Sequence, residues 1–149
     1  MPNLTVSIAA DHRGFPLKSF LVEWLKKNGH TVKDLGTAST ERCDAIDYAK
    51  KLAEDMGSGA ATFGVLICGT GHAMAMTANR YRRIRAAHCM DVTMARLARE
   101  HNDANVLVLG ANLIGEAVAL DCLETFLKTS FLGGRYADRR DRLTGLGGL

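Results

Sequence analysis

Short apolar segments alternate with longer amphipathic segments along most of this chain, and that alternation restricts the possible folds strongly. The short segments have the length of buried β-strands and are rich in aliphatic residues. They cover residues 4–9, 31–34, 63–67, 85–88 and 106–109. Strands that alternate with helices predict a parallel sheet with helices on both faces, because each crossover returns the chain to the same edge of the sheet.

The amphipathic segments carry the end signals of helices. Gly29 follows the first of them, where a helix is expected to stop. Asp44 and Asp91 precede two others and are expected to act as N-caps. The last of these helices is predicted over residues 113–128. The result is an α/β fold of three layers, a doubly wound five-stranded parallel sheet of the flavodoxin-like or Rossmann-like type.

The composition agrees with one globular domain over residues 1–149. Apolar residues make up 47% of the chain and charged residues 23%, both ordinary values. We expect the α/β core to end near residue 130 and residues 131–149 to form an extended tail with at most one short helix. Nineteen Lys and Arg against sixteen Asp and Glu give a net charge of +3, too mild to indicate a nucleic-acid or membrane partner.

The sequence favours a cytoplasmic protein. The N-terminal residues lack the basic and long apolar regions of a signal peptide, and no apolar run reaches the ~18 residues of a membrane span. The cysteines are Cys43, Cys68, Cys89 and Cys122, with no CxxC pair, which disfavours a zinc site or a redox motif. Reduced thiols and no bound metal are therefore expected.

The most specific chemical signal follows the third predicted strand. Cys68 ends that strand, and Gly69 and Gly71 follow it, so that backbone N–H groups can converge on an anion. The same N–H groups would stabilise a thiolate at Cys68. The loop lacks the endings of nucleotide-binding loops. An equally weighted alternative is that Cys68 is a small buried residue in a tight turn.

Two other pairs could take part in proton transfer. Asp11 and His12 follow the first strand, although Asp11 is equally suited to cap the next helix. His101 and Asn102 end the fourth helix, where a histidine is more often a partner of the helix dipole. His30 is expected in a surface loop.

The tail is rich in arginine and glycine. Twelve of the nineteen basic residues are arginine, and four of these fall between Arg135 and Arg142. The planar guanidinium suits phosphate and carboxylate ligands. The tail is either a solvated, partly frayed terminus or a segment that lies across a second subunit.

Together these segments resemble the ribose-5-phosphate isomerase B and galactose-6-phosphate isomerase family. The resemblance is collinear from Val6 to about Arg139, and its order makes it more specific than any single motif. The segments that carry it are Asp11-His12-Arg13-Gly14-Phe15, Gly36-Thr37, Glu41-Arg42, Ile67-Cys68-Gly69-Thr70-Gly71, Ala78-Asn79, residues 101–105 and Gly133-Gly134-Arg135.

The resemblance implies a flavodoxin-like homodimer or homotetramer with active sites between subunits. It implies isomerisation of ribose 5-phosphate to ribulose 5-phosphate through a cis-enediolate, without a metal, nucleotide or other cofactor. Cys68 matches the catalytic base. The loop that holds the enediolate oxygens matches Gly69, Thr70, Gly71, His72 and Ala73, with Thr70 also expected in catalysis.

The resemblance also assigns the remaining groups. His101 matches the acid that opens the furanose ring, with Asp11 assisting at the sugar oxygens and Asn102 at a hydroxyl. The groups around the phosphate match His12, Arg135 and Arg139, and the two arginines are expected from the neighbouring tail.

The chain departs from the family pattern at two places in the expected site. His72-Ala73-Met74 makes the loop bulkier than the usual Val-Gly-Ile, and Asn112 stands where many members have an arginine that reaches the phosphate. These departures keep three functions open. The same chemistry on another sugar phosphate, such as a tetrose, allose or galactose phosphate, is one alternative, and a non-catalytic sugar-phosphate-binding subunit is another.

Overall fold

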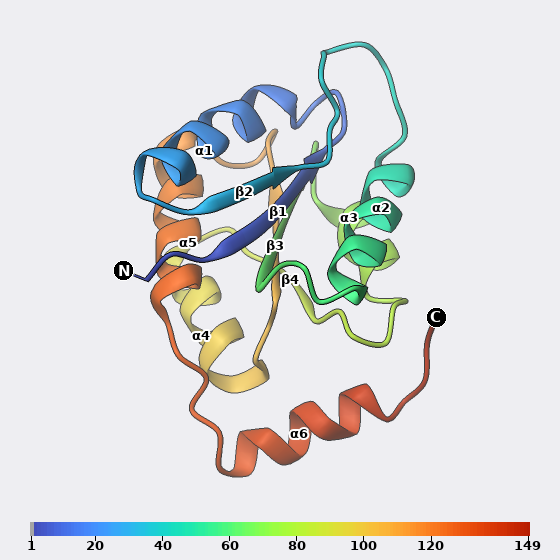
Figure 1. The fold of residues 1–149 in the computed structure, drawn as a ribbon, viewed down its shortest axis with the longest axis vertical. Helices are drawn as coiled ribbons and strands as arrows, with labels where there is room; N and C mark the ends of the chain where they lie inside the picture. Colours follow the sequence, from blue (N-terminus) through green and yellow to red (C-terminus); the bar gives the residue numbers. More distant parts are fainter. Residues whose placement is uncertain (1) are drawn as a thin grey trace.

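The computed structural model describes residues 2–149 and contains a five-stranded, all-parallel sheet (Figure 1). The strand order is β2-β1-β3-β5-β4. The strands are β1 (Thr5–Ala10), β2 (Thr31–Asp34), β3 (Phe63–Cys68), β4 (Ala86–His88) and β5 (Val106–Gly110). The predicted doubly wound α/β fold is confirmed.

Helices cover both faces of the sheet and make the three layers (Figure 1). One face carries α1 (Phe15–Lys27), α4 (Val92–Asn102) and α5 (Glu116–Lys128). The other carries α2 (Ala45–Gly57) and α3 (His72–Ala78).

The central strand β3 shows how the sequence builds two cores at once. Val65 and Ile67 pack against the face that carries α1 and α5, whereas Leu66 and Cys68 pack against the face that carries α2 and α3. Successive side chains of a strand point to opposite faces, so a strand that is buried on both sides must be apolar throughout. All six residues of β3 are buried.

The predicted caps are present, and one predicted boundary is wrong. The side chain of Asp44 accepts a hydrogen bond from the Ile46 N–H, and that of Asp91 accepts one from the Met94 N–H. Helix α5 begins at Glu116 rather than at residue 113. The N–H groups of Leu113 and Ile114 donate to the Gly110 carbonyl and form a turn there instead.

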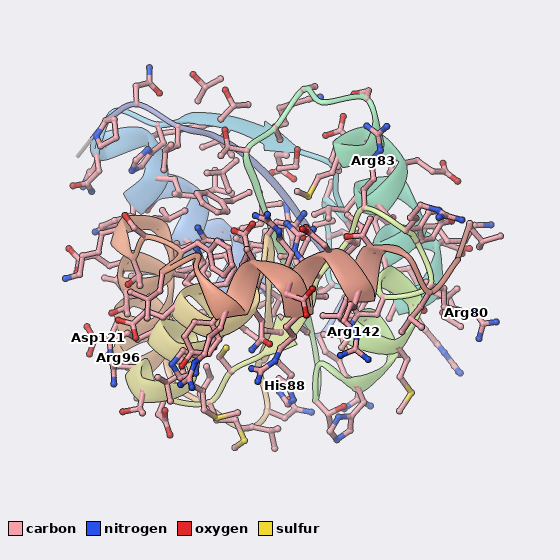
Figure 2. All side chains as sticks on the ribbon, turned by 90° about the horizontal axis from the view of Figure 1, so that it is seen from below. Arg80, Arg83, His88, Arg96, Asp121 and Arg142 are labelled. Carbon is pink, nitrogen blue, oxygen red and sulfur yellow. The ribbon has the colours of Figure 1, made fainter. Side chains whose placement is uncertain are left out.

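Ten residues of the tail form one helix, α6 (Arg135–Thr144), where at most one short helix was expected. Figure 1 shows α6 below the amino ends of the strands, and Figure 2 shows it crossing this end of the molecule. The last residue returns to the body of the chain: Leu149 N–H donates to the Arg80 carbonyl over 2.9 Å. No residue of α6 is buried.

His30 was expected in a surface loop, and this prediction is wrong because His30 is buried. The residue is 5% exposed, and its Nδ1 accepts a hydrogen bond from the Leu4 N–H over 3.2 Å. Burial lowers the pKa of this imidazole. Among residues 2–149, no helix combines the length and apolar character needed to cross a membrane.

Candidate active site

Cys68 is the last residue of β3, at the carboxyl edge of the sheet. Its side chain is held in place, because the residue is 5% exposed and its Sγ accepts a hydrogen bond from the Gly71 N–H over 3.1 Å. Gly71 has a φ of +88°, a conformation that L-residues with a side chain rarely adopt. The loop therefore bends back so that a backbone donor points at the sulfur.

The glycines of this loop also let other groups approach closely. A Cβ at Gly69 would lie 3.0 Å from Nδ2 of Asn112 and 3.1 Å from Cδ of Arg13. The backbone of Asn112 is fixed to the loop as well, since its N–H donates to the Gly69 carbonyl over 2.9 Å. Asn112 and Arg13 thus both lie close to Gly69, where a side chain at this position would point.

The rest of the loop begins α3 and is open to solvent. Thr70 and His72 are exposed, and Oγ1 of Thr70 accepts a hydrogen bond from the His72 N–H over 3.3 Å. Ala73 is half-buried in the first turn of α3. Polar groups that flank the thiol are accordingly accessible to a ligand.

Asp11 lies beside this loop because β1 and β3 are neighbours in the sheet. The strands pair with Ala10 opposite Ile67, so that Asp11 and Cys68 are the next residues along each strand. Asp11 is 6% exposed, and its Oδ1 accepts hydrogen bonds from the N–H groups of Arg13 and Gly14, each over 3.0 Å. The N-cap position of α1 is Gly14, so Asp11 holds the preceding turn instead.

A cavity of about 890 Å³ opens next to Asp11 and is lined by basic residues, of which only His12 was expected in the site. His12 lines it, and Nδ1 of His12 accepts a hydrogen bond from the Cys43 N–H over 3.3 Å. Arg13 and Arg42 line it as well. The sequence signal for Arg13 was its place just after β1, and the signal for Arg42 was its place shortly before α2.

His88 is a second residue that the sequence did not single out. It ends β4, and its ring packs edge-on against His72 with the ring centroids 5.4 Å apart. A Cβ at Gly71 would lie 3.0 Å from the His88 ring. Burial, with a smaller effect of the His72 charge, lowers the pKa of His88.

The other predicted residues gather around α6. His101, near the end of α4, stacks on Tyr136 with centroids 4.5 Å apart and ring planes 11° apart. The guanidinium groups of Arg135 and Arg139 lie 5.0 Å and 5.5 Å from the same Tyr136 ring. Asn102, the last residue of α4, is half-buried.

These two groups lie at opposite ends of the parallel strands, one at the carboxyl ends (the carboxyl edge) and one at the amino ends (the amino edge). One chain therefore does not bring all predicted residues together. Helix α4 leads into β5, and its last residues lie beyond the amino end of that strand (Figure 1). Cys68 pairs with Gly110 at the carboxyl end of the same strand. Five residues of strand span about 16 Å, which separates His101 from the thiol by the length of the sheet.

The remaining buried cysteines differ from Cys68 in their surroundings. Burial raises the pKa of Cys89 to about 12 and that of Cys122 to about 11, so both thiols stay neutral at pH 7. Across residues 2–149, no three His, Cys, Asp or Glu side chains are grouped so that they could hold a metal ion.

Comparison with known proteins shows the family of the chain. The sequence profile of the family described as Ribose/Galactose Isomerase matches residues 6–143. Ribose-5-phosphate isomerase B of Escherichia coli is 37% identical over 95% of this chain and 95% of its own. A crystal structure of a ribose 5-phosphate isomerase from Thermotoga maritima shares 46% identity, with a TM-score of 0.95 over 97% of this chain and 100% of that chain.

A third relative was crystallised with a ligand. Ribose-5-phosphate isomerase B of Mycoplasma genitalium, with bound ribulose-5-phosphate, is 34% identical and has a TM-score of 0.90 over 95% of this chain and 94% of that chain. Sequence and fold agree over nearly the whole length in each comparison. The chain belongs to the ribose/galactose isomerase family.

Proposed function

We propose that this protein interconverts ribose 5-phosphate and ribulose 5-phosphate, with Cys68 as the base. The observation that carries the proposal is the pairing of a buried strand-end thiol with the Gly71 N–H over 3.1 Å. A backbone donor aimed at the sulfur favours the thiolate, and a thiolate can remove a proton next to a carbonyl.

The reaction needs one proton to move between two carbons. The Cys68 thiolate removes the C2 proton of the open-chain aldose, the C1=C2 bond forms, and the carbonyl electron pair moves to O1. The thiol then returns the proton to C1, while the O2 proton is transferred to O1 as the C2 carbonyl forms. The N–H groups from Gly69 to Ala73 stabilise the enediolate, at roughly 3 to 4 kcal/mol per well-placed donor.

We further propose that each active site is shared between two copies of the chain. The carboxyl edge of one copy supplies Cys68, Asp11 and the loop. The amino edge of the other supplies His101 and Asn102 for ring opening and hydroxyl binding, with Arg135 and Arg139 for the phosphate. The support is geometric: the two groups lie at opposite ends of one sheet, and the two arginines are exposed on α6.

A second substrate class is favoured by one observation. Asn112, which lies over Gly69, is a neutral amide, so it offers no charge to a phosphate at this place. Arg13 approaches the same glycine, and Arg42 lines the adjacent cavity together with His12. A phosphate bound by these groups would be shifted, and a tetrose or hexose phosphate would then compete as substrate.

The test is an assay of the pure protein with a panel of aldose and ketose phosphates in the presence of a chelator. Cys68→Ala and Cys68→Ser are measured beside the wild type. We expect the highest kcat/KM with ribose 5-phosphate and almost none in either variant. Turnover of none of the sugars, or full activity of Cys68→Ala, would refute the proposal.

If another sugar phosphate has the highest kcat/KM, the substrate assignment moves to the second class. Transfer of solvent deuterium to the bound sugar identifies catalysis, because a protein that only binds sugar phosphates exchanges no carbon-bound hydrogen.

A further inference from the structure

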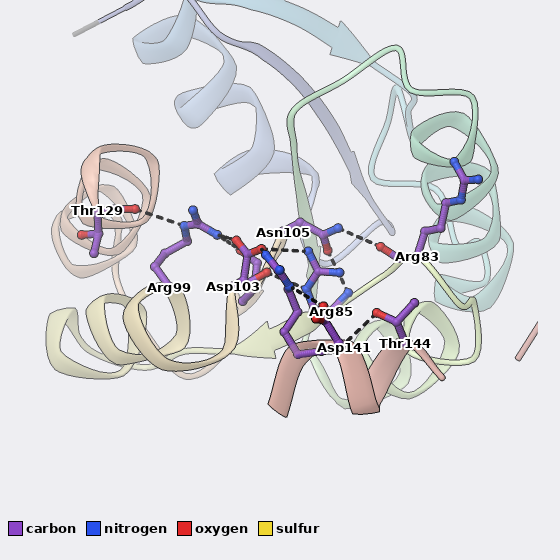
Figure 3. Close-up of polar contacts among 10 residues, drawn as sticks. Arg83, Arg85, Arg99, Asp103, Asn105, Thr129, Asp141 and Thr144 are labelled. Carbon is purple, nitrogen blue, oxygen red and sulfur yellow. Dashed lines mark hydrogen bonds and ion pairs between the residues drawn. The ribbon is translucent and has the colours of Figure 1, made fainter. Parts of the chain in front are cut away.

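Asp103 joins three segments at the amino ends of the strands: the end of α4, helix α6 and the residue before β4. Asp103 directly follows His101 and Asn102, and it has a φ of +49°, an unusual backbone conformation for a residue other than glycine. Its Oδ1 accepts a hydrogen bond from Nη1 of Arg99 over 2.9 Å, and its Oδ2 accepts one from Nη1 of Arg140 over 2.9 Å. Figure 3 shows Arg99 reaching toward Asp103, with Arg85 close by.

The third partner of Asp103 is Arg85, the residue directly before β4. Nε of Arg85 donates to the Asp103 carbonyl over 2.7 Å, and Nη2 of Arg85 lies 3.5 Å from Oδ2. Burial alone would raise the pKa of Asp103, but the hydrogen bonds from Arg140 and Arg99 outweigh it and lower that pKa. The carboxylate is therefore charged at neutral pH.

Helix α6 depends on polar contacts because it contributes no buried residue to an apolar core. Glycines with positive φ at 133 and 134 precede it, so the backbone there can turn freely. Leu132 N–H donates to the Glu100 carbonyl over 3.2 Å just before these glycines. Within α6, Arg140 forms an ion pair with Asp103, which directly follows α4.

The same helix carries the groups that surround His101. Tyr136 stacks on the imidazole, and Nη2 of Arg135 donates to Oη of Tyr136 over 3.0 Å. Tyr136 and Arg140 are four residues apart and so lie on the same side of α6. The ion pair of Arg140 and the ring that packs on His101 therefore lie on the same side of α6.

We propose that Asp103 is a positioning residue, which holds the end of α4 and helix α6 in one fixed arrangement through its arginine partners. This inference rests on the proposed function, because the groups it holds are the ring-opening acid and the phosphate arginines. Asp103 touches no substrate in this account. It acts by fixing where His101 and the arginines of α6 point.

Arg140→Gln is the sharpest variant, because it breaks the link to α6 and leaves Arg99 paired with Asp103. Arg140→Lys restores the charge. Arg96→Gln is the matched control: Arg96 is an exposed arginine of α4 whose ion pair with Glu100 stays within α4. Hydrogen exchange of residues 135–144 and steady-state kinetics are measured for all of them.

We expect Arg140→Gln to lose exchange protection in α6 while the strands keep theirs. A displacement of about 1 Å in a substrate-positioning group lowers activity by about 100-fold, and we expect that loss in kcat/KM. The loss should include kcat, because His101 acts on the bound sugar. Arg140→Lys should recover most of the activity, and Arg96→Gln should behave as the wild type.

Two results would overturn the inference: Arg140→Gln with unchanged protection of α6, or lost protection with unchanged kcat and KM. Asp103→Asn gives a second measure, since asparagine tolerates the same backbone conformation. It should reproduce both effects of Arg140→Gln, and wild-type behaviour of this variant would also contradict the inference. A wild type that turns over no sugar phosphate refutes the proposed function instead, and the exchange measurement then shows whether Asp103 still fixes α6.

Discussion

The two edges of the sheet are built in different ways. At the carboxyl edge, Cys68 ends one buried strand, Asp11 directly follows another, and both residues are almost fully buried. At the amino edge, His101 lies near the end of a helix and packs against α6, which contains no buried residue. The first group is fixed by the apolar core, whereas the second is fixed by ion pairs and aromatic stacking.

This difference separates proton transfer at the carbons from ring opening and phosphate binding in the proposed mechanism. The rigid edge supplies the base and the N–H donors, where small displacements are costly. The polar edge supplies exposed arginines, which suit the capture of a charged ligand from solvent. Mutations at the two edges should therefore have different kinetic signatures.

The largest expected effect is at the base. Cys68→Ala should lower kcat by about 1,000-fold, because general base catalysis contributes roughly 100- to 10,000-fold. The midpoint of thermal unfolding should change little, since alanine fits the space of a small side chain. Initial rates and calorimetry of the same preparation check both statements, and a variant within tenfold of the wild type would contradict the assignment.

The next effect concerns the glycine loop. Gly71→Ala should lower kcat by about 100-fold, comparable to the loss of one oxyanion donor. The new methyl group would lie 3.0 Å from His88, and the left-handed backbone costs about 1 to 2 kcal/mol for an L-residue.

Gly29→Ala is the control for backbone strain. Gly29 has a φ of +84°, but an added Cβ meets nothing within 4 Å. Gly29→Ala should lower the free energy of unfolding by a similar strain energy, while kcat stays unchanged. Equal kinetic losses in the two variants would show that the loop has no particular role.

A smaller effect is expected at the polar edge. Arg139→Gln should raise KM by about tenfold, the equivalent of roughly 1.4 kcal/mol, with little change in kcat. The side chain is exposed, so stability should stay within about 0.5 kcal/mol of the wild type. Arg96→Gln serves again as the matched arginine control. A drop in kcat with unchanged KM would indicate that Arg139 acts on the reacting carbons instead.

The smallest effect is on stability at acid pH. The pKa of Asp103 is lowered in the folded protein against an ordinary value of 3.8, through hydrogen bonds from Arg140 and Arg99 that outweigh burial. Its stabilisation is therefore fully present above pH 3.8 and is lost as pH falls through the lowered pKa. Urea unfolding between neutral and acid pH should show a flatter profile for Asp103→Asn, and parallel profiles would rule this contribution out.

Much of the fold follows from local chemistry, and the sequence predicted it for that reason. Continuous apolar strands, the caps at Asp44 and Asp91 and a glycine at the end of the first helix are short-range signals. The errors came from longer-range contacts. The N–H of Leu4 donates a hydrogen bond to His30, and the Gly110 carbonyl accepts hydrogen bonds from Leu113 and Ile114, so that α5 begins only after them.

Candidate site residues could be named from the sequence more readily than their arrangement in space could be predicted. The residues after β1 and β3 follow from strand ends, and the resemblance supplied His101 and the tail arginines. No local pattern indicates that these lie at opposite edges. The ion pair of Arg140 with Asp103 joins residues 37 apart, and sequence periodicity contains no information about such contacts.

The shared active site, with opposite edges supplied by two chains, can be tested by mixing two inactive variants. Cys68→Ala and His101→Ala should each be inactive alone, because one loses the base and the other the acid in both sites of a dimer. Co-expressed in equal amounts, they should recover about one quarter of wild-type activity per chain, since half of the dimers then hold one intact site. Cys68→Ala with Asp11→Asn, two lesions of the same edge, should recover none. Failure of the first mixture to regain activity, with mixed dimers demonstrated, would contradict the shared site.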